Sequence, residues 1–369
     1  MKFIPVLLFF FLGAGTAVRA QDTCMDNRWS IDMTPVVIDG KYYAVWSGWE
    51  DYFEEAEAPE QNLYIAELHF HDRRPYVTLG RRALLSVPEK EWELKRNEKI
   101  SLLEGPQALY HDGDVFIVYS TRGSWTPYYK MGLLEYRHGR NPLDPSSWVK
   151  SESPVFALDP PRSDTSTVSY GAGHASFVKS PDGTQDWICY HSKTSLKPGW
   201  GDRKVFLSEF VFGNDGLPVF KAASSQSDRP SGETGPEEWD TGMPVKFSNP
   251  IYAGADPWII LENGKYYTCR ADGRGIRVTE SSYMTESEGP DAVSRIVWTL
   301  HDPDSGKWNI RQLWAPELHH IGGKWYIFYT AGRQAKAPFW EQRSGVLVSE
   351  DGPFGPYAEH DENPLFTGD

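Results

Sequence analysis

Five polar side chains recur along the chain, each followed about nine residues later by a Gly turn and an aromatic strand. They are Asp32, Glu104, His174, Asp256 and Glu317, separated by steps of 72, 70, 82 and 61 residues. A repeated supersecondary unit puts equivalent positions at equivalent places in the fold. If five such units close into a ring, the five side chains converge on its axis.

Three of these residues are carboxylates: Asp32, Glu104 and Asp256. A carboxyl group among aromatic residues at the start of an inner strand is partly desolvated, which raises its pKa while its neighbours stay ionised. Glycoside hydrolysis needs such a pair, an acid to protonate the leaving oxygen and a base to activate water. The alternative is that Asp and Glu only cap turns at strand starts. The spacing alone does not choose between them.

Short strand signals dominate the elements that would position these residues. Runs of aromatic and β-branched residues are bounded by Gly, Asp or Asn, and four turns carry strong hairpin signals. These turns are Asp39-Gly40, Asp112-Gly113, Asp182-Gly183 and Asn263-Gly264. Units of this length predict an all-β fold, a five-bladed propeller of four-stranded antiparallel blades. A β-sandwich is the alternative, although it would not need so long a unit.

The amino-acid composition favours some classes of function and argues against others. Aromatic residues make up 14% of the chain and include 15 Trp, which suits all-β packing or a sugar-binding surface. The net charge of −14 and the absence of a basic stripe argue against a nucleic-acid partner. No apolar run in the sequence is long enough to span a bilayer. Cys24, Cys189 and Cys269 lack zinc-ligand spacing, and no metal site is predicted.

The ends and the middle of the chain define its organisation. Residues 1–20 resemble a signal peptide, with a core strand as the alternative, so we expect a secreted, extracellular protein. Residues 21–369 are expected to form a single catalytic propeller domain. Within it, three blades over 21–221 and two over 246–369 flank a Ser-, Gly- and Pro-rich linker over 222–245. The first and last segments together make about one repeat, so the termini would lie side by side.

Five segments of the sequence resemble motifs of glycoside hydrolase family 43, the five-bladed propellers of arabinofuranosidases, arabinanases and β-xylosidases. The segments are Trp-Ser-Ile-Asp at 29–32, Glu-Gly-Pro at 104–106, Gly-His-Ala-Ser-Phe at 173–177, Gly-Ala-Asp-Pro-Trp at 254–258 and Trp-Ala-Pro-Glu at 314–317. The resemblance covers nearly all of residues 25–369. Any one motif alone is a weak signal, whereas five that agree are a strong one.

The resemblance implies a role for each segment. Asp256 corresponds to the general base, Glu104 to the general acid and Asp32 to the aspartate that tunes the acid. His174 corresponds to a histidine in the central channel near a metal or water. No cofactor is required, although calcium or another cation near His174 is compatible with the resemblance. The implied mechanism inverts the configuration of the sugar.

The blade order departs from that of the family. There the base blade comes first, followed by the Trp-Ala-Pro-Glu, tuning, acid and histidine blades. Here the tuning, acid and histidine blades precede the base blade, as if the chain were circularly permuted. Propeller termini lie at the surface and close together, which makes permutation physically feasible. The rival explanation is a piece of a tandem gene that carries the back of one domain and the front of the next.

The predicted substrate is an arabinose- or xylose-containing plant polysaccharide or oligosaccharide. We favour an α-L-arabinofuranosidase, with β-xylosidase, endo-arabinanase or a non-catalytic carbohydrate-binding propeller as alternatives. Glu317, Trp125, Trp46 and His174 are the candidate substrate-binding residues. For each tryptophan, core packing is the competing interpretation. We expect a monomer with no membrane partner.

Overall fold

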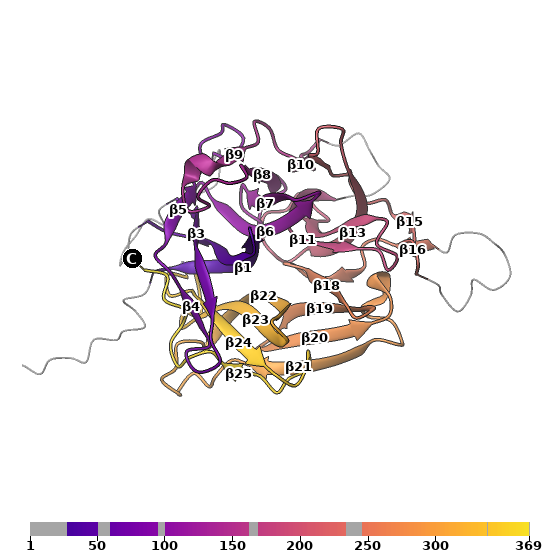
Figure 1. Cartoon of the computed structure of the whole chain (residues 1–369). Helices are drawn as coiled ribbons and strands as arrows, with labels where there is room; N and C mark the ends of the chain where they lie inside the picture. Colours follow the sequence, from indigo (N-terminus) through magenta and orange to yellow (C-terminus); the bar gives the residue numbers. More distant parts are fainter. Residues whose placement is uncertain are drawn as a thin grey trace, which may run out of the picture.

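The computed structural model describes residues 28–50, 60–94, 100–161, 169–233, 246–337 and 339–368. The predicted signal peptide and Cys24 lie outside these residues. Five sheets surround a common centre (Figure 1). The helices of the described residues are two short 3₁₀ turns, Pro145–Ser147 and Met284–Glu286, and none could cross a membrane.

Each sheet is an antiparallel blade, numbered here in chain order. Blade 1 contains β1 (Ser30–Ile38), β2 (Lys41–Gly48), β3 (Asn62–Phe70), β4 (Val77–Leu79) and β5 (Ala83–Ser86). Blade 2 contains β6 (Leu103–His111), β7 (Asp114–Thr121), β8 (Lys130–Tyr136), β9 (Trp148–Lys150) and β10 (Phe156–Ala157). Blade 3 contains β11 (Tyr170–Lys179), β12 (Asp186–Lys193), β13 (Arg203–Phe212), β14 (Pro218–Val219) and β17 (Tyr252–Ala253). Blade 4 contains β18 (Trp258–Glu262), β19 (Lys265–Asp272), β20 (Gly275–Ser281) and β21 (Val293–Thr299). Blade 5 contains β22 (Arg311–Ile321), β23 (Lys324–Gly332), β24 (Arg343–Ser349) and β25 (Ala358–Glu359).

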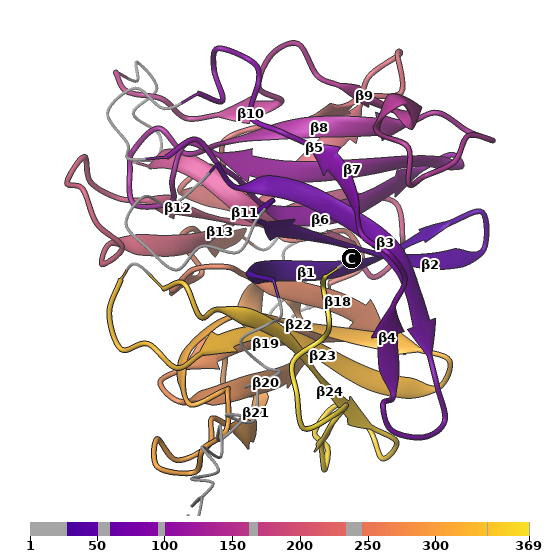
Figure 2. The same ribbon diagram turned by 90° about the vertical axis from the view of Figure 1, so that its left-hand side faces the viewer.

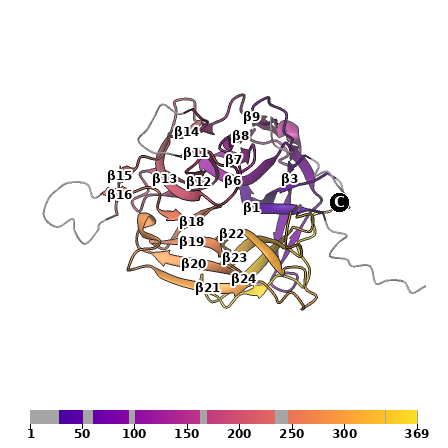
Figure 3. The same cartoon turned by 180° about the vertical axis from the view of Figure 1, so that it is seen from behind.

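The innermost strands β1, β6, β11, β18 and β22 line the centre, each in contact with the next, and β22 contacts β1 to close the ring. Figures 1 and 3 show these strands around the middle of the molecule from opposite sides, with the last strand of each blade toward the outside. The all-β, five-bladed propeller predicted from the repeat is confirmed.

Tight turns explain why the inner hairpins form where they do. Asp39-Gly40, Asp112-Gly113, Asn263-Gly264 and Gly322-Gly323 each place two consecutive residues at positive φ. This is the backbone of a two-residue turn whose twist matches that of the flanking strands, and Gly, Asn and Asp adopt it at least cost. Each of these turns joins an innermost strand to the second strand of its blade.

Apolar clusters between adjacent blades form the core. One cluster, for example, joins Val118 of blade 2 to Ile188 and Phe206 of blade 3, and another joins Ile259 of blade 4 to Leu207 of blade 3. Two more lie between blades 1 and 2 and between blades 4 and 5. Burial of these faces holds the blades in register. Cys189 and Cys269 are buried unpaired members of such clusters, as small core residues are.

The junction between blades 1 and 5 has the same apolar filling. Met33 and Trp46 pack with Phe328, Val346 and Leu365 in one cluster. Hydrogen bonds also cross it: the Ser344 N–H donates to Ser30 Oγ at 3.0 Å, and Thr367 Oγ1 donates to the Arg28 carbonyl at 3.1 Å. The described ends of the chain therefore lie side by side, and the C-terminus lies near β1 and β3 in Figure 2. Within the described residues, every strand of blade 1 comes from the N-terminal end of the chain and every strand of blade 5 from the C-terminal end. In this part of the chain the two blades exchange no strand.

The expected linker over 222–245 is only partly an exposed connection. Ala223 and Glu233 are buried, and β15 (Gln226–Asp228) pairs with β16 (Lys246–Ser248). The sequence after it also returns to the first block, because β17 pairs with β13 of blade 3. Ser, Gly and Pro content indicated a lack of regular structure but could not reveal these contacts.

Candidate active site

The innermost strands are irregular where their polar residues lie. Asp32, His174 and Asp256 have φ values of 53°, 46° and 50°, and Gly105, directly after Glu104, has 53°. The pairing of β1, β6 and β11 with their neighbours shifts register at the same points. A bulge redirects side chains, and a non-glycine residue at positive φ stores strain that typically accompanies function. The bulges therefore turn Asp32, Glu104 and His174 away from the regular alternation of their strands, whereas Asp256 lies just before β18 begins.

Glu104 is buried beside Asp32. The Gly105 N–H donates to Asp32 Oδ2 at 3.2 Å, which ties the Asp32 carboxylate to the backbone directly after Glu104. Burial raises the pKa of Glu104 to about 7, and the negative charge of Asp32 adds to the rise. Burial also raises the pKa of Asp32, to about 6. Glu104 is therefore the group best suited to carry a proton near neutral pH.

Asp256 has the opposite environment. Its Oδ1 lies 3.3 Å from Nδ1 of His174, 3.3 Å from Nδ1 of His191 and 3.6 Å from Nη1 of Arg203. The Asp256 backbone N–H donates to Nδ1 of His191 at 3.1 Å. Burial alone would raise the pKa of Asp256, but the charge of His174, the neighbouring His191 ring and the Arg203 guanidinium together hold it well below its usual value. The Asp256 carboxylate therefore stays ionised.

His174 sits among all of these carboxylates. Burial alone would lower the pKa of His174, but Asp256, then Asp32 and the two glutamates of the cluster, raise it above its ordinary value. Its backbone N–H donates to Ser120 Oγ at 2.8 Å, which fixes it against blade 2. These mutual electrostatic effects show that the five residues predicted from the repeat converge at the centre of the ring.

Glu317 is the fifth member and is held by its neighbours. Gln107 Nε2 donates a short hydrogen bond to Oε1 of Glu317, and Nε2 of His319 lies 3.1 Å from its Oε2. The ring of His319 packs on Trp258, with centroids 4.5 Å apart. Both carboxylate oxygens of Glu317 are thus engaged within the protein.

Comparisons with known proteins connect this geometry to a family. The sequence pattern described as "Glycosyl hydrolases family 43" matches residues 17–218 and 247–366. The chain belongs to this family. In sequence, it is 31% identical over 214 residues to the Alpha-L-arabinofuranosidase 43 of Humicola insolens, covering 56% of this chain and 41% of that protein. It is also 30% identical over 200 residues to an extracellular exo-alpha-(1->5)-L-arabinofuranosidase of Streptomyces avermitilis, covering 53% and 38%. The matched regions span less than half the length of these relatives.

Two solved structures confirm the fold. The arabinanase of Cellvibrio cellulosa, solved with arabinohexaose, aligns with a TM-score of 0.55 at 16% identity over 91% of this chain and 96% of that one. The xylan beta-1,4-xylosidase of Bacillus halodurans aligns with a TM-score of 0.52 at 13% identity over 92% and 56%. At such low identity the likeness shows the propeller architecture alone.

The predicted aromatic binding residues separate into two kinds. Trp125 is half-buried in the loop after β7. Trp46, by contrast, is 1% exposed and stacks on Tyr64 inside the apolar cluster between blades 1 and 5. The expectation that Trp46 contacts substrate is therefore wrong, because a fully buried indole offers no face to a sugar. A tryptophan in a strand can point to either face, and the sequence did not settle which.

Several residues of the site were not singled out from the sequence. His191 and Arg203, from β12 and β13, contact Asp256, and Tyr129 stacks on His191 with centroids 5.4 Å apart. His319 contacts Glu317. All of them fall outside the repeated position: His191 and Arg203 lie on the second and third strands of blade 3, Tyr129 lies in the loop before β8, and His319 lies two residues after Glu317 on β22.

Calcium or another cation near His174 stays a prediction. The Nδ1 of His174 is turned toward the Asp256 carboxylate, so Nε2 is the ring nitrogen that would face an ion. Among the described residues no three His, Cys, Asp or Glu side chains are placed to share one ion.

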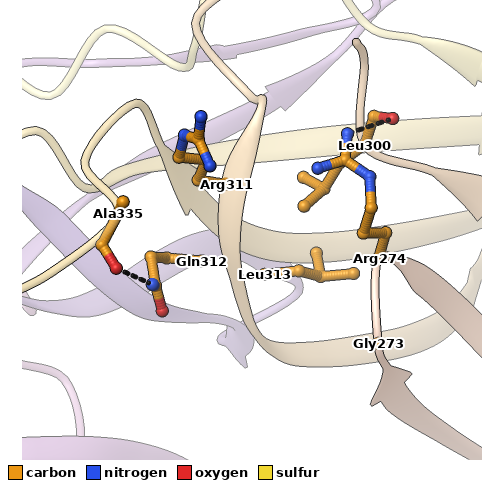
Figure 4. Close-up of a pocket in the computed structure, with 7 residues that line it drawn as sticks. All are labelled: Gly273, Arg274, Leu300, Arg311, Gln312, Leu313 and Ala335. Atoms are coloured by element: carbon orange, nitrogen blue, oxygen red, sulfur yellow. Dashed lines mark hydrogen bonds between the residues drawn. The ribbon is translucent and has the colours of Figure 1, made fainter. Parts of the chain in front are cut away.

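A pocket lies between blades 4 and 5 (Figure 4). Arg274 and Arg311 lie on either side of it, with Leu300 and Leu313 between them. The Arg274 guanidinium donates to the carbonyls of Leu300 and Ile310 at 3.2 and 3.0 Å, so it fastens the two blades together. The pocket contains none of the clustered carboxylates and is separate from the candidate active site.

Proposed function

We propose that this family 43 protein is a secreted, inverting glycoside hydrolase that releases α-L-arabinofuranosyl units from arabinose-containing plant polysaccharides. The observation that carries the proposal is the separation of two pKa values in one buried cluster. The pKa of Glu104 is raised to about 7 and that of Asp256 is lowered. Two carboxyl groups whose environments push their pKa values apart are the acid and the base of such a reaction.

The reaction follows from these protonation states. Asp256 accepts a proton from water as the water oxygen forms a bond to the anomeric carbon. The bond from that carbon to the leaving oxygen breaks, and the leaving oxygen takes the proton of Glu104. Asp32 positions Glu104 through the Gly105 N–H and raises its pKa. Solvent then returns the proton to Glu104 and removes the one on Asp256.

The choice of sugar rests on the relatives. The two relatives that match this chain at 31% and 30% identity are named arabinofuranosidases, whereas the arabinanase and xylosidase structures share only the fold. Hydrolysis of 4-nitrophenyl α-L-arabinofuranoside, 4-nitrophenyl β-D-xyloside and linear arabinan by the purified chain compares the three activities. The proposal expects the arabinofuranoside to have the highest kcat/KM. Binding of oligosaccharides without hydrolysis of any substrate would instead indicate a non-catalytic propeller.

Stereochemistry tests the mechanism directly. Inverting enzymes leave about 6.5–9.5 Å between the carboxyl groups to admit water, while retaining enzymes keep about 5–5.5 Å. Proton NMR of the first-formed arabinose should show the anomer opposite to that of the substrate. Appearance of the retained anomer first would overturn the assignment of Asp256 as a base rather than a nucleophile.

The order of the blades supports a second part of the proposal, that the ring is circularly permuted relative to the family. The family pattern matches in two separate segments, broken between residues 218 and 247, where the expected linker lies. The described ends meet instead between blades 1 and 5. A chain opened at a different blade junction would show both features.

A further inference from the structure

Two surface loops leave blades 2 and 3 at the end of the ring where the carboxylates lie. Leu103, next to Glu104, pairs with Thr121, the last residue before the β7–β8 loop. Tyr170, at the start of β11, pairs with Lys193, the last residue before the β12–β13 loop. The loops over residues 122–129 and 194–202 therefore border the candidate active site on adjacent blades.

Each loop carries a tryptophan, and the two indoles meet. The ring centroids of Trp125 and Trp200 lie 5.7 Å apart at an interplanar angle of 71°, an edge-to-face pair. The ring of Trp125 lies against Gly123, where an added Cβ would come within 2.8 Å of it. Trp200 is 50% exposed, so a large apolar surface faces solvent beside the site.

Hydrogen bonds hold Trp200 in this position. The Gly199 N–H donates to the Trp125 carbonyl at 2.8 Å, and the Trp200 indole N–H donates to Ser124 Oγ at 3.3 Å. The buried Lys193 donates to the Gly199 carbonyl at 2.5 Å. The loop is therefore anchored on both sides of an exposed aromatic ring, and ligand binding there loses little conformational entropy.

Arg203 connects this loop to the candidate base. Its Nε donates to the Trp200 carbonyl at 3.3 Å, while its Nη1 lies 3.6 Å from Oδ1 of Asp256. A single guanidinium thus spans the distance from the backbone of Trp200 to the Asp256 carboxylate. A ligand that reaches the carboxylates and extends over blade 3 passes the exposed indole.

We propose that Trp200, braced by Trp125, is a stacking platform for a sugar unit of the substrate outside the unit being cleaved off. The inference rests on the proposed function, since it assumes an arabinose-containing chain. The flat apolar face of an indole matches the C–H face of a sugar ring, and its N–H is already bonded elsewhere. Trp200 would then set the preference for oligosaccharides over monosaccharide glycosides, while Glu104 and Asp256 perform the chemistry.

The test compares two substrates with equally poor alcohol leaving groups, methyl α-L-arabinofuranoside and α-1,5-linked arabinotetraose. For Trp200→Ala we expect kcat/KM on arabinotetraose to fall about tenfold, or about 1.4 kcal/mol, with the methyl glycoside little changed. Leu196→Ala removes an apolar side chain that is 54% exposed in the same loop and should affect neither substrate. Trp200→Phe keeps an aromatic face and should restore most of the loss.

Three results would overturn the proposal that Trp200 is a stacking platform: an equal fall in kcat/KM on both substrates, no fall on either, or a Phe variant as poor as the Ala variant. Circular dichroism shows whether each variant is folded. Calorimetric binding of arabinotetraose to Glu104→Gln, with and without Trp200→Ala, decides the question without turnover. Failure of the proposed function gives a different result, a wild-type chain that hydrolyses neither substrate.

Discussion

At the scale of single residues, burial and then the charge of Asp32 raise the pKa of Glu104. Glu104 acts only when protonated, so activity is present below its pKa of about 7 and is lost as pH rises through that value. The negative charge of Asp32 raises this pKa, so Asp32→Asn should move the alkaline limb of kcat/KM to lower pH. The pH profile of kcat/KM for hydrolysis of an arabinofuranoside measures this shift. Asp39→Asn, in an exposed hairpin turn, is the matched control, and a limb that stays in place would refute the role of Asp32.

The dependence of the rate on the leaving group tests the assignment of Glu104 as the general acid. General acid catalysis contributes about 10²–10⁴-fold, and it matters most when the leaving oxygen is basic. Glu104→Gln should therefore lower kcat on an alkyl arabinofuranoside by that order and on an activated dinitrophenyl glycoside far less. The alkaline limb should disappear in the same variant. Equal losses on the two substrates would show that Glu104 is not the acid.

Residue types alone predicted the five inner-strand members of the site but not their surroundings. Asp32, Glu104 and Asp256 repeat at one position of each unit, which the sequence displays. His191 and Arg203 contact Asp256 only because β12 and β13 pair in a particular register. Trp46 was assigned wrongly, because β2 is covered on both faces and every residue from Tyr43 to Gly48 is buried, so neither face of this strand segment is open to a sugar.

At the scale of the element, the bulge of β6 controls the distance between Glu104 and His174. Gly105 has a φ of 53°, and an added Cβ would lie 3.0 Å from Cγ of His174. Gly105→Ala should therefore displace both side chains, and a misplacement of about 1 Å costs about 10²-fold in rate. Kinetics on the arabinofuranoside and thermal unfolding measure the two effects separately.

Gly113→Ala provides the control for backbone strain. Its φ is 95°, but an added Cβ meets nothing within 4 Å, and it lies in the turn at the other end of the same strand. A side chain at positive φ costs about 1–2 kcal/mol, so both variants should lose stability. Only Gly105→Ala should lose activity. Similar activity losses in the two would mean that strain, and not contact with His174, is responsible. The sequence predicts the turn at Gly113, but the bulge at Gly105 has no comparable signature.

At the scale of the whole molecule, the junction between blades 1 and 5, where the chain ends meet, is packed like the other blade junctions. Apolar clusters fill the junction between blades 1 and 5 as they fill the others, and β22 contacts β1 as β6 contacts β1. The repeat predicts a closed ring because five units converge, but side-chain packing at the junction depends on residues such as Leu365 that carry no motif. Stability should therefore depend on which blades touch and little on where the chain is opened.

A rearranged chain tests this directly. Residue 368 would be joined to residue 28 by a short Gly-Ser linker, because Thr367 and Arg28 already share a hydrogen bond of 3.1 Å. New ends would be opened between residues 233 and 246, which places the Asp256 blade first. We expect the same circular dichroism spectrum and a kcat/KM within about threefold of the original, because loop closure changes free energy only slowly with loop length. Opening the chain at Gly322-Gly323 instead separates β22 from β23 within one blade and should lower the melting temperature sharply. If the first rearrangement failed to fold while the second succeeded, the ring would depend on its present ends, and the proposed permutation would have to be abandoned.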